Sequence, residues 1–566
     1  MRVLASPESF PAIKGAADQY SGERLDDDCR TVHLSVYQAP TDAVLRAFGQ
    51  ADQWVQPGGA AGTGSPCTAT EPIASEATTP DASGQTGLPI PSRDVGPQPD
   101  IWFPDSVLDV QRAKACLPPG SSTVSFAAPV SVARSPLVLG VPEARRGFPS
   151  PGQLLPWRDL LDYVKTAKLN LIRPNPTTST AGLLHSIGLY KAVTGLDGQP
   201  PADGDLGAVR DIESSMVGQG VSMADTEDLL CDLKPDQPVP AVLVSERALL
   251  SYNMGELPGC PVAPGQGRHM LAYYPQGFLV LDYPAVQVTW ASQTGDGDRR
   301  RAVTQGLQDW LLSDTGQHSL TRHGLRPARE DVTRDPADQV AKPQGGAWQD
   351  VPIDTVDRGP VEREAQSAID YYVQVRTPGQ VVFLLDVSSS MAAQGNVDTA
   401  KRLIAGATEL MGPVDDAALM TVPTSLDDPG PQPRVPQYAD AAGLRAQLAG
   451  AALLRNDAAL YQAIEVALQA MNSGDAAAKR ALVLVTDGED INDDGGAQSR
   501  SQVDQVLGGV STPTAVPVHV LALAPGVCDA RNFASLLASK SGGQCVTTID
   551  SATTTKLGAS IFAGSN

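Results

Sequence analysis

The sequence predicts an α/β protein built from more than one domain. Short apolar runs typical of buried strands alternate along the chain with amphipathic stretches of helical spacing, and this alternation is typical of folds with largely parallel sheets. The chain has 566 residues, which is more than one domain usually holds. With 42% hydrophobic residues, each domain can bury an ordinary core.

The N-terminal block, residues 1–326, shows this alternation first. Strand-like runs such as RVLAS, SPLVLGVP and AVLVS are separated by helical stretches such as DAVLRAFGQADQW and PWRDLLDYV. Residues from about 55 to 99 are rich in Gly, Pro, Ser and Thr, which predicts an inserted loop. Over 327–360 the sequence is polar and lacks periodicity, which predicts an interdomain linker that a protease would cut first.

Residues 361–566 are predicted to form the last domain, a doubly wound, Rossmann-like sheet. After a short helix, VVFLLD is a continuous apolar strand of the kind expected where helices cover both faces of a sheet. NVDTAKRLIAGATELMG places its apolar residues on one helical face and ends at Gly412-Pro413. Further strands, AALMTV, ALVLVT and VPVHVLAL, alternate with further helices.

The net charge restricts the function. A formal charge of −22 at pH 7 argues against binding to nucleic-acid phosphates, because no basic surface offsets it. The sequence has no apolar run long enough to span a membrane, and MRVLASPESF lacks the apolar core of a signal peptide and is predicted to start with a strand. We therefore expect contact with a membrane only through an anchor that this sequence does not contain.

Seven cysteines bear on the cellular compartment. None forms a CxxC pair, so a zinc site is not expected. Cys231 and Cys260 flank one segment and Cys528 and Cys545 another, a layout that suits two disulfides and an oxidising compartment. The alternative is a cytoplasmic protein with buried free thiols. The sequence leaves open the pairing of the other three cysteines, Cys29, Cys67 and Cys116.

Polar side chains follow two of the apolar strands in the last domain. Asp386 ends VVFLLD, Ser388 and Ser390 stand at the second and fourth positions after it, and Asp487 follows ALVLVT. Ligands of doubly wound sheets bind beyond the carboxyl ends of the strands, so we expect these oxygens to lie together. Two carboxylates and two hydroxyls form a hard oxygen site of the kind that Mg²⁺ prefers. The alternative for DVSSS alone is a turn with local hydrogen bonds.

Residues 379–566 resemble a von Willebrand factor type A domain. DVSSSM resembles the metal-ion-dependent adhesion site (MIDAS) motif of that family, and TDGED resembles its second acidic motif. The resemblance implies that Asp386, Ser388, Ser390 and Asp487 hold a divalent cation, Mg²⁺ or else Mn²⁺ or Ca²⁺. It also implies a protein partner whose carboxylate completes the coordination.

One position departs from the family pattern. The family usually has a Thr ligand before the helix that opens with a pair such as Leu-Tyr, and here RNDAALYQAI places Ala458 at that position. The neighbouring Asp457 is a candidate substitute, and its added charge would change the site. We therefore expect metal binding to be weakened.

An enzyme is not predicted. A nucleophilic serine needs a base, and His519, the single histidine of the last domain, lies inside an apolar strand. The sequence contains neither GxSxG nor GxxxxGK[ST]. These observations favour a binding protein.

Residues 1–326 resemble type 2 periplasmic binding proteins, a group that includes molybdate-binding proteins. The matching stretches follow in the same order and include RVLASPESF, PDIWFPDS, RSPLVLGVP, VSERALLSYN and LQDWLLSDTGQHSLTRHGLRP. The resemblance implies two α/β lobes that close on a small molecule or anion. It makes Ser6, Ser135 and Tyr252 candidate ligand contacts. The alternatives are an N-cap, a turn residue and a core tyrosine.

The order of the two blocks along the chain is also similar to that of a known group of proteins. A solute-binding block followed by a type A domain resembles surface proteins of actinobacterial type, which implies an extracellular, surface-attached protein. Its last domain would bind a protein partner through the metal, and its first block would hold a small solute or be a scaffold. Two alternatives remain, the solute-binding component of an ABC importer and an intracellular partner of an AAA+ ATPase.

Overall fold

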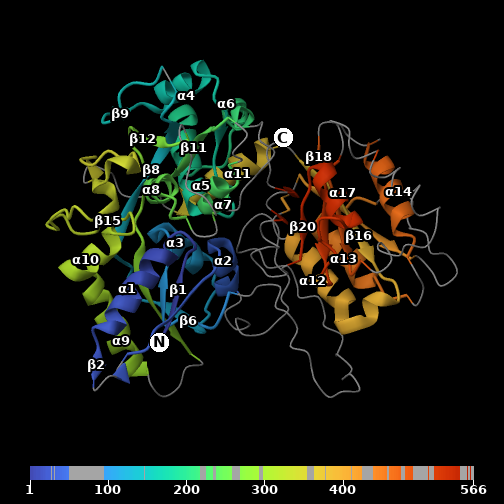
Figure 1. Cartoon of the computed structure of the whole chain (residues 1–566), viewed down its shortest axis with the longest axis horizontal. Helices are drawn as coiled ribbons and strands as arrows, with labels where there is room; N and C mark the ends of the chain where they lie inside the picture. The colour runs from blue at the N-terminus through green and yellow to red at the C-terminus, as the bar shows by residue number, and fades with distance from the viewer. Residues whose placement is uncertain are drawn as a thin grey trace. The chain divides into compact units, whose positions relative to one another are not determined.

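The chain of this computed structural model forms two compact units, and Figure 1 shows the elements of each. Described residues up to Arg376 form the N-terminal unit and those from 378 onwards form the C-terminal unit. The structure describes residues 1–26, 29–30, 32–49, 95–145, 147–216, 225–233, 238–257, 260, 268–291, 297–353, 362–376, 378–408, 411–412, 414–423, 437–454, 458–472, 478–488, 508, 516–547, 557–558 and 561–562.

The first lobe of the N-terminal unit is built on a sheet of strand order β4-β1-β5-β14-β6. β1 pairs in parallel with β4 and β5, whereas β14 pairs antiparallel with β5 and β6. The strands are β1 (Arg2–Ala5), β4 (Ser35–Gln38), β5 (Ile101–Phe103), β6 (Val124–Phe126), β7 (Val130–Ser131) and β14 (Pro284–Trp290). The helices are α1 (Phe10–Gly22), α2 (Thr41–Gly49), α3 (Val107–Cys116), α9 (Gly297–Leu311) and α10 (Asp314–Thr321).

The second lobe is built on a sheet of order β10-β11-β8-β12-β9, with β13 and β15 also paired to β8. Its strands are β8 (Ala133–Pro142), β9 (Leu154–Leu155), β10 (Leu171–Ile172), β11 (Ala241–Ser245), β12 (Met270–Pro275), β13 (Val280–Leu281) and β15 (Arg326–Pro327). Its helices are α4 (Trp157–Thr166), α5 (Thr180–Thr194), α6 (Asp203–Ser215), α7 (Thr226–Cys231) and α8 (Glu246–Met254). The chain passes between the two sheets at β7–β8, at β13–β14 and between β14 and β15, so the predicted two-lobed α/β fold is confirmed.

Residues 327–353 pack on the N-terminal unit, which differs from the linker expected over 327–360. Arg326 forms a buried ion pair with Glu246 (2.7 Å) and donates to the main-chain carbonyl of Trp348 (2.7 Å). Any residue can supply a main-chain carbonyl, so the polar composition of the segment does not reveal such contacts. The expected protease-sensitive linker therefore does not extend over residues 327–353.

α11 (Glu362–Val375) also belongs to the N-terminal unit, although we expected the last domain to start at residue 361. The helix packs against α5 and α6, and Ser367 donates a hydrogen bond to the main-chain oxygen of Gln199 (2.6 Å). Its apolar face, with Ala368 and Ile369, joins the N-terminal core. The apolar spacing predicts the helix correctly but does not say which core it covers.

The C-terminal unit has a parallel sheet of strand order β17-β16-β18-β19-β20, which confirms the doubly wound prediction. Alternate residues of β16 enter two different apolar clusters, so helices cover both faces of the sheet. The strands are β16 (Gly379–Asp386), β17 (Asp416–Val422), β18 (Lys479–Thr486), β19 (Val518–Ala522) and β20 (Cys545–Val546). The helices include α12 (Asn396–Ala407), α13 (Ala441–Gly450), α14 (Leu460–Asn472) and α17 (Phe533–Ser541).

Both expected disulfides are confirmed. Cys231 pairs with Cys260 and Cys528 with Cys545, with Cα–Cα distances of 5.3 and 5.5 Å. Cys116 is disulfide-bonded as well. The predicted insertion of about 55–99, with its cysteine, lies outside the described residues except for 95–99. None of the helices described above could cross a bilayer.

The burial of His185 of α5 in the N-terminal unit can be tested through the pH dependence of stability. Its ring is buried, with Nε2 3.1 Å from the carbonyl of Val244, and burial lowers its pKa to about 3. The unfolded chain takes up this proton near pH 6.5 and the folded chain does not, so stability is full above pH 6.5 and falls as the pH drops. We expect the N-terminal unit to lose about 2 kcal/mol from this group between pH 7.5 and 5.

Urea unfolding of wild type, His185→Gln and the matched control His269→Gln at both pH values measures this loss. The substitution His185→Gln should remove about 2 kcal/mol of pH dependence, whereas the control at the partly exposed His269 should keep it. The same pH dependence in wild type and His185→Gln would contradict the assignment.

Candidate functional site

The carboxyl ends of β16 and β18 bring the four predicted metal-ligand side chains together. The two strands pair in parallel up to Leu385 and Val485, so the residues that follow them leave the sheet at the same edge. The amide of Ser388 donates to Asp386 Oδ1 (2.9 Å), and the hydroxyls of Ser388 and Ser390 lie 3.0 Å apart. Ser390 Oγ in turn donates to Asp487 Oδ1 (3.1 Å). A continuous chain of hydrogen bonds therefore joins all four side chains.

Burial makes Asp386 an unusual carboxylate. Its side chain is 0% exposed, and its pKa rises to about 6, chiefly because burial penalises the charged form and to a lesser extent because of the charge of Asp487. Hydrogen bonds from Ser388 and Thr486 act in the opposite direction. A cation beside this carboxylate would offset the cost of its burial, so the donor set fits a divalent ion with a preference for oxygen ligands.

The candidate site is not an acidic cluster. Within the described ranges no group of three or more His, Cys, Asp and Glu side chains is placed to hold a metal. The set at the edge of the C-terminal sheet consists instead of two carboxylates and two hydroxyls. Such a set leaves coordination positions for water or for a ligand from a partner.

Thr486 is a member of the site that the sequence analysis missed. Its buried hydroxyl donates to Asp386 Oδ2 (2.7 Å) and accepts from the amide of Gly488 (2.9 Å). Thr486 thus fixes the carboxylate oxygen that Ser388 does not contact. Gly488 has φ +80°, and a Cβ there would lie 2.6 Å from a methyl group of Val527. The signal for this residue is the sequence TDG, in which Thr486 directly precedes Asp487.

The chain just before the segment that departs from the family pattern contacts the loop after Asp386. The amide of Leu454 donates to the carbonyl of Val387, the residue after Asp386 (2.8 Å). Ala458 is partly buried and packs against the apolar cluster that includes α14. Its methyl group supplies no oxygen ligand, as the sequence indicates. The candidate substitute, Asp457, lies outside the described residues.

A second cluster of buried polar side chains joins the two lobes of the N-terminal unit, and we call it the interlobe cluster. Each of its side chains is at most 6% exposed. The first lobe contributes residues after β1 and β5, the second lobe contributes residues of β8, β11 and α8, and one tyrosine lies where the chain passes between the lobes. The members are Ser6, Glu8, Ser9, Asp105, Ser135, Ser245, Arg247 and Tyr283.

Hydrogen bonds within the first lobe organise one end of the cluster. Ser6 Oγ donates to Asp105 Oδ1 and lies 2.8 Å from Ser9 Oγ. The pKa of Asp105 is raised well above its ordinary value, first by burial and then by the charge of Glu8. Two carboxyl groups therefore lie close together in a site closed to solvent.

Glu8 is the link between the two lobes. Ser245 Oγ of the second lobe donates to Glu8 Oε1, and Tyr283 Oη donates to the same oxygen (3.2 Å). On the second lobe, the amide of Arg247 donates to Ser135 Oγ (3.0 Å).

The structure places the three predicted ligand contacts in two different environments. Ser6 and Ser135 belong to the interlobe cluster. Tyr252 does not, because its ring lies in an apolar cluster of the second lobe. Burial raises the pKa of its hydroxyl, and the neighbouring Arg268 offsets only part of this effect. The sequence analysis missed Glu8, although this residue stands two positions after Ser6 in ASPES.

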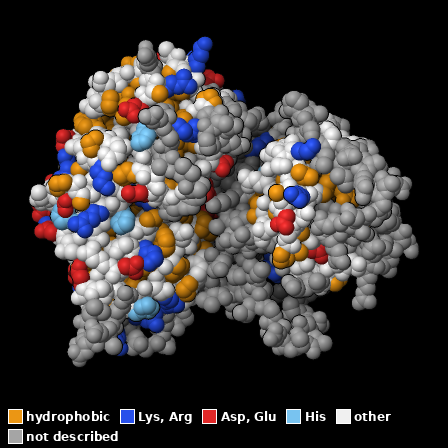
Figure 2. Space-filling view, viewed as in Figure 1, with side chains coloured by type: hydrophobic (Ala, Val, Ile, Leu, Met, Phe, Trp, Pro, Cys, Tyr) orange, Lys and Arg blue, Asp and Glu red, His pale blue; other side chains and the backbone are white. Residues whose placement is uncertain are grey.

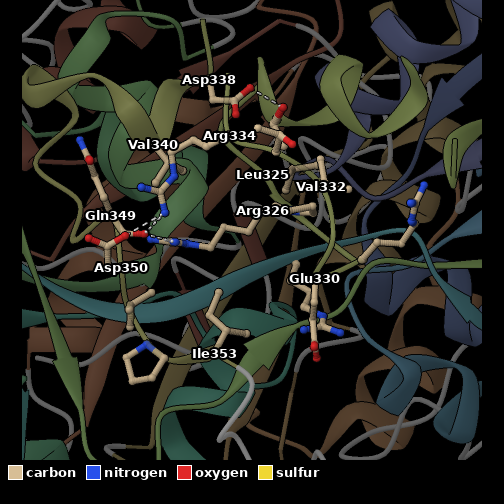
Figure 3. Close-up of a pocket in the computed structure, with 17 residues that line it drawn as sticks. Leu325, Arg326, Glu330, Val332, Arg334, Asp338, Val340, Gln349, Asp350 and Ile353 are labelled. Carbon is tan, nitrogen blue, oxygen red and sulfur yellow. Dashed lines mark hydrogen bonds and ion pairs between the residues drawn. The ribbon is translucent and has the colours of Figure 1, made fainter. Parts of the chain in front are cut away.

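A cavity of about 510 Å³ lies elsewhere in the N-terminal unit, lined largely by residues 325–353 (Figure 3). Its arginines are engaged by the chain itself, since Arg326 donates to the carbonyl of Gln349 (2.9 Å) and Arg334 pairs with Asp350 (3.0 Å). The residues that line it include none of the three predicted ligand contacts.

Comparison with known proteins assigns both units. Residues 2–326 match the family model described as bacterial extracellular solute-binding protein, and residues 380–558 match the von Willebrand factor type A domain. No curated protein matches the chain.

Solved structures that match include the sulfate-binding protein SubI from Mycobacterium tuberculosis H37Rv, at 13% identity and a TM-score of 0.34, over 63% of this chain and 99% of that one. A putative extracellular solute-binding protein from Bordetella parapertussis matches at 10% identity and a TM-score of 0.37, over 66% and 98%. A von Willebrand factor type A protein from Catenulispora acidiphila matches at 14% identity and a TM-score of 0.25, over 32% of this chain and 41% of that one. Because the first family model spans more than half of the sequence, the chain belongs to the bacterial extracellular solute-binding protein family and carries a von Willebrand factor type A domain after that block.

Proposed function

We propose that this protein is a non-enzymatic, extracytoplasmic binding protein whose C-terminal unit engages a protein partner through a divalent cation. Asp386, Ser388, Ser390 and Asp487 would hold the cation, and a carboxylate of the partner would complete its coordination. When bound, the cation supplies positive charge and coordination positions that attract an anionic side chain. The residues of the chain hold and orient the site.

The hydrogen-bond chain from Asp386 to Asp487 is the observation that carries this proposal. It gathers oxygen ligands from two strand ends at one edge of a parallel sheet, where α/β proteins bind their ligands. Thr486 holds Asp386 from the side opposite to Ser388, so the carboxylate is oriented by the chain. Preorganised ligands of this kind reduce the entropic cost of binding.

The disulfides and the surface charge agree with an extracytoplasmic protein that binds another protein. Disulfides persist in oxidising compartments, so they do not favour the intracellular alternative beside an AAA+ ATPase. The visible face of the N-terminal unit intersperses Lys and Arg with Asp and Glu (Figure 2), and the net charge of the chain is −22. Nucleic acid is therefore not the partner in this proposal.

The N-terminal unit acts as a scaffold in this proposal, because the polar side chains of the interlobe cluster are bonded to one another. A second candidate function, the solute-binding component of an ABC importer, is favoured by the family match over residues 2–326. It requires that a free solute displaces those internal bonds. Calorimetric titration of the wild-type chain with small anions would reveal such a solute.

The metal site is tested by titrating chelator-stripped protein with Mg²⁺ and Mn²⁺ in a calorimeter. We expect saturable binding in the wild type and its loss in Asp386→Asn, because the neutral amide supplies less charge to the ion. Asp415→Asn is a matched control: Asp415 is also buried in this unit and accepts from the amides of Gly379 and Gly412 (both 2.7 Å), away from the site. Equal binding by wild type and Asp386→Asn would refute the assignment.

A substitution at Ala458 tests whether an added ligand increases the affinity for the metal. The substitution Ala458→Thr adds the hydroxyl ligand that the family usually has at this position, so it should tighten Mn²⁺ binding by about tenfold or more. Ala458→Val adds similar bulk without an oxygen and is the control. The prediction fails if threonine and valine change the affinity equally.

A further inference from the structure

We propose that Ser245, Tyr283 and Arg247 form a carboxylate-binding site that Glu8 of the same chain occupies. Glu8 is then an internal ligand that latches the two lobes of the N-terminal unit together, and a free anion is excluded from the wild-type site. This inference does not depend on the metal site of the C-terminal unit. In this proposal the interlobe cluster is an anion-binding site, and the carboxylate of Glu8 fills it.

The side chain of Glu8 crosses from one lobe to the other. Glu8 follows β1 of the first sheet, whereas Ser245 ends β11 of the second sheet and donates its hydroxyl to Glu8 Oε1. Tyr283, where the chain passes between the sheets, donates to the same oxygen (3.2 Å). Glu8 is 6% exposed, so these donors replace the water that its carboxyl group loses on burial.

Burial raises the pKa of Glu8 above its ordinary value, and groups of the second lobe act in the opposite direction by favouring the charged form. Ser245 is the N-cap of α8 and accepts from the amide of Ala248 (3.1 Å), so the positive end of this helix faces the site. Arg247, in the first turn of the same helix, is 2% exposed and its charge lowers the pKa of Glu8 against the effect of burial. Arg247 Nη1 pairs with Glu227 (2.7 Å), but its Nε has no acceptor among the described residues. Arg247 therefore keeps one buried donor that no described group satisfies.

The backbone of Tyr283 adopts an unusual conformation that fixes the position of its side-chain hydroxyl. Tyr283 has φ +29°, which side chains of its size rarely adopt. Hydrogen bonds hold this conformation on both sides, because the amide of Tyr283 donates to the carbonyl of Asp105 (3.1 Å) and its carbonyl accepts from the amide of Val132 (3.2 Å). A tyrosine fixed in this way presents its hydroxyl to Glu8 with little loss of rotational freedom.

The competing explanation is a cation held by Glu8 and Asp105. The hydrogen bonds favour the internal ligand, because Asp105 Oδ1 already accepts from Ser6 and Glu8 Oε1 accepts from two hydroxyls. Arg247 already supplies a buried positive charge close to both carboxyl groups.

Calorimetric titration of the full chain with sodium formate, and with acetamide as a neutral control, tests the proposal. We expect no saturable binding by the wild type and saturable formate binding by Glu8→Ala, at least about tenfold tighter than any wild-type signal. Glu8→Gln should bind no formate, because its amide still fills the site. Tyr283→Phe in the Glu8→Ala background should weaken formate binding by about tenfold to a hundredfold, the loss expected for one hydrogen bond to a charged group.

If Glu8→Ala is too unstable for titration, its yield after refolding is measured instead. Its refolded yield should then be higher in sodium formate than in sodium chloride at equal ionic strength, whereas the yield of the wild type should be the same in both salts. A folded Glu8→Ala that binds no formate, or a yield that formate does not change, overturns the proposal. Saturable binding of Mg²⁺, K⁺ or putrescine to the wild type that is lost in Glu8→Gln and kept in Asp386→Asn would overturn it in favour of a cation site.

Discussion

Asp386 cannot carry its charge at the end of β16 unless neighbouring groups replace the water that it has lost. The amide of Ser388 and the hydroxyl of Thr486 do this at its two oxygens, and they tie β16 to the loop that follows it and to β18. Ser390 and Asp487 extend the same network across the edge of the sheet. The arrangement of the whole edge therefore follows from the need to solvate one buried carboxylate from within the protein.

The same constraint applies in the N-terminal unit, where the solution is different. Glu8 is also a buried carboxylate beyond the end of a strand, but its hydrogen-bond donors come from the opposite lobe. Solvation of this group therefore fixes the two lobes relative to one another. In the C-terminal unit the donors to the buried carboxylate come from neighbouring strand ends of one sheet, whereas in the N-terminal unit they come from the other lobe.

The segment after residue 326 shows how backbone contacts define a domain. Arg326 is buried beside Glu246, and the carbonyls of Trp348 and Gln349 complete the surroundings of its guanidinium. A buried arginine needs such acceptors, so the segment that supplies them must stay on the N-terminal unit. α11 follows and covers part of the same core, so the C-terminal unit begins close to its first strand.

By itself, the sequence determined the α/β class, the doubly wound last domain, both described disulfide pairs and the grouping of two aspartates and two serines after β16 and β18, because apolar periodicity and residue spacing encode these features locally. The family resemblance named Ser6, Ser135 and Tyr252 together, and the structure places the two serines between the lobes and Tyr252 in an apolar cluster. Only the tertiary structure decided that Thr486 holds Asp386, that Glu8 bridges the lobes and that residues 327–353 are not a linker. Each of these depends on a hydrogen bond or ion pair between groups far apart in the chain, and such contacts leave no periodic trace in the residues that make them.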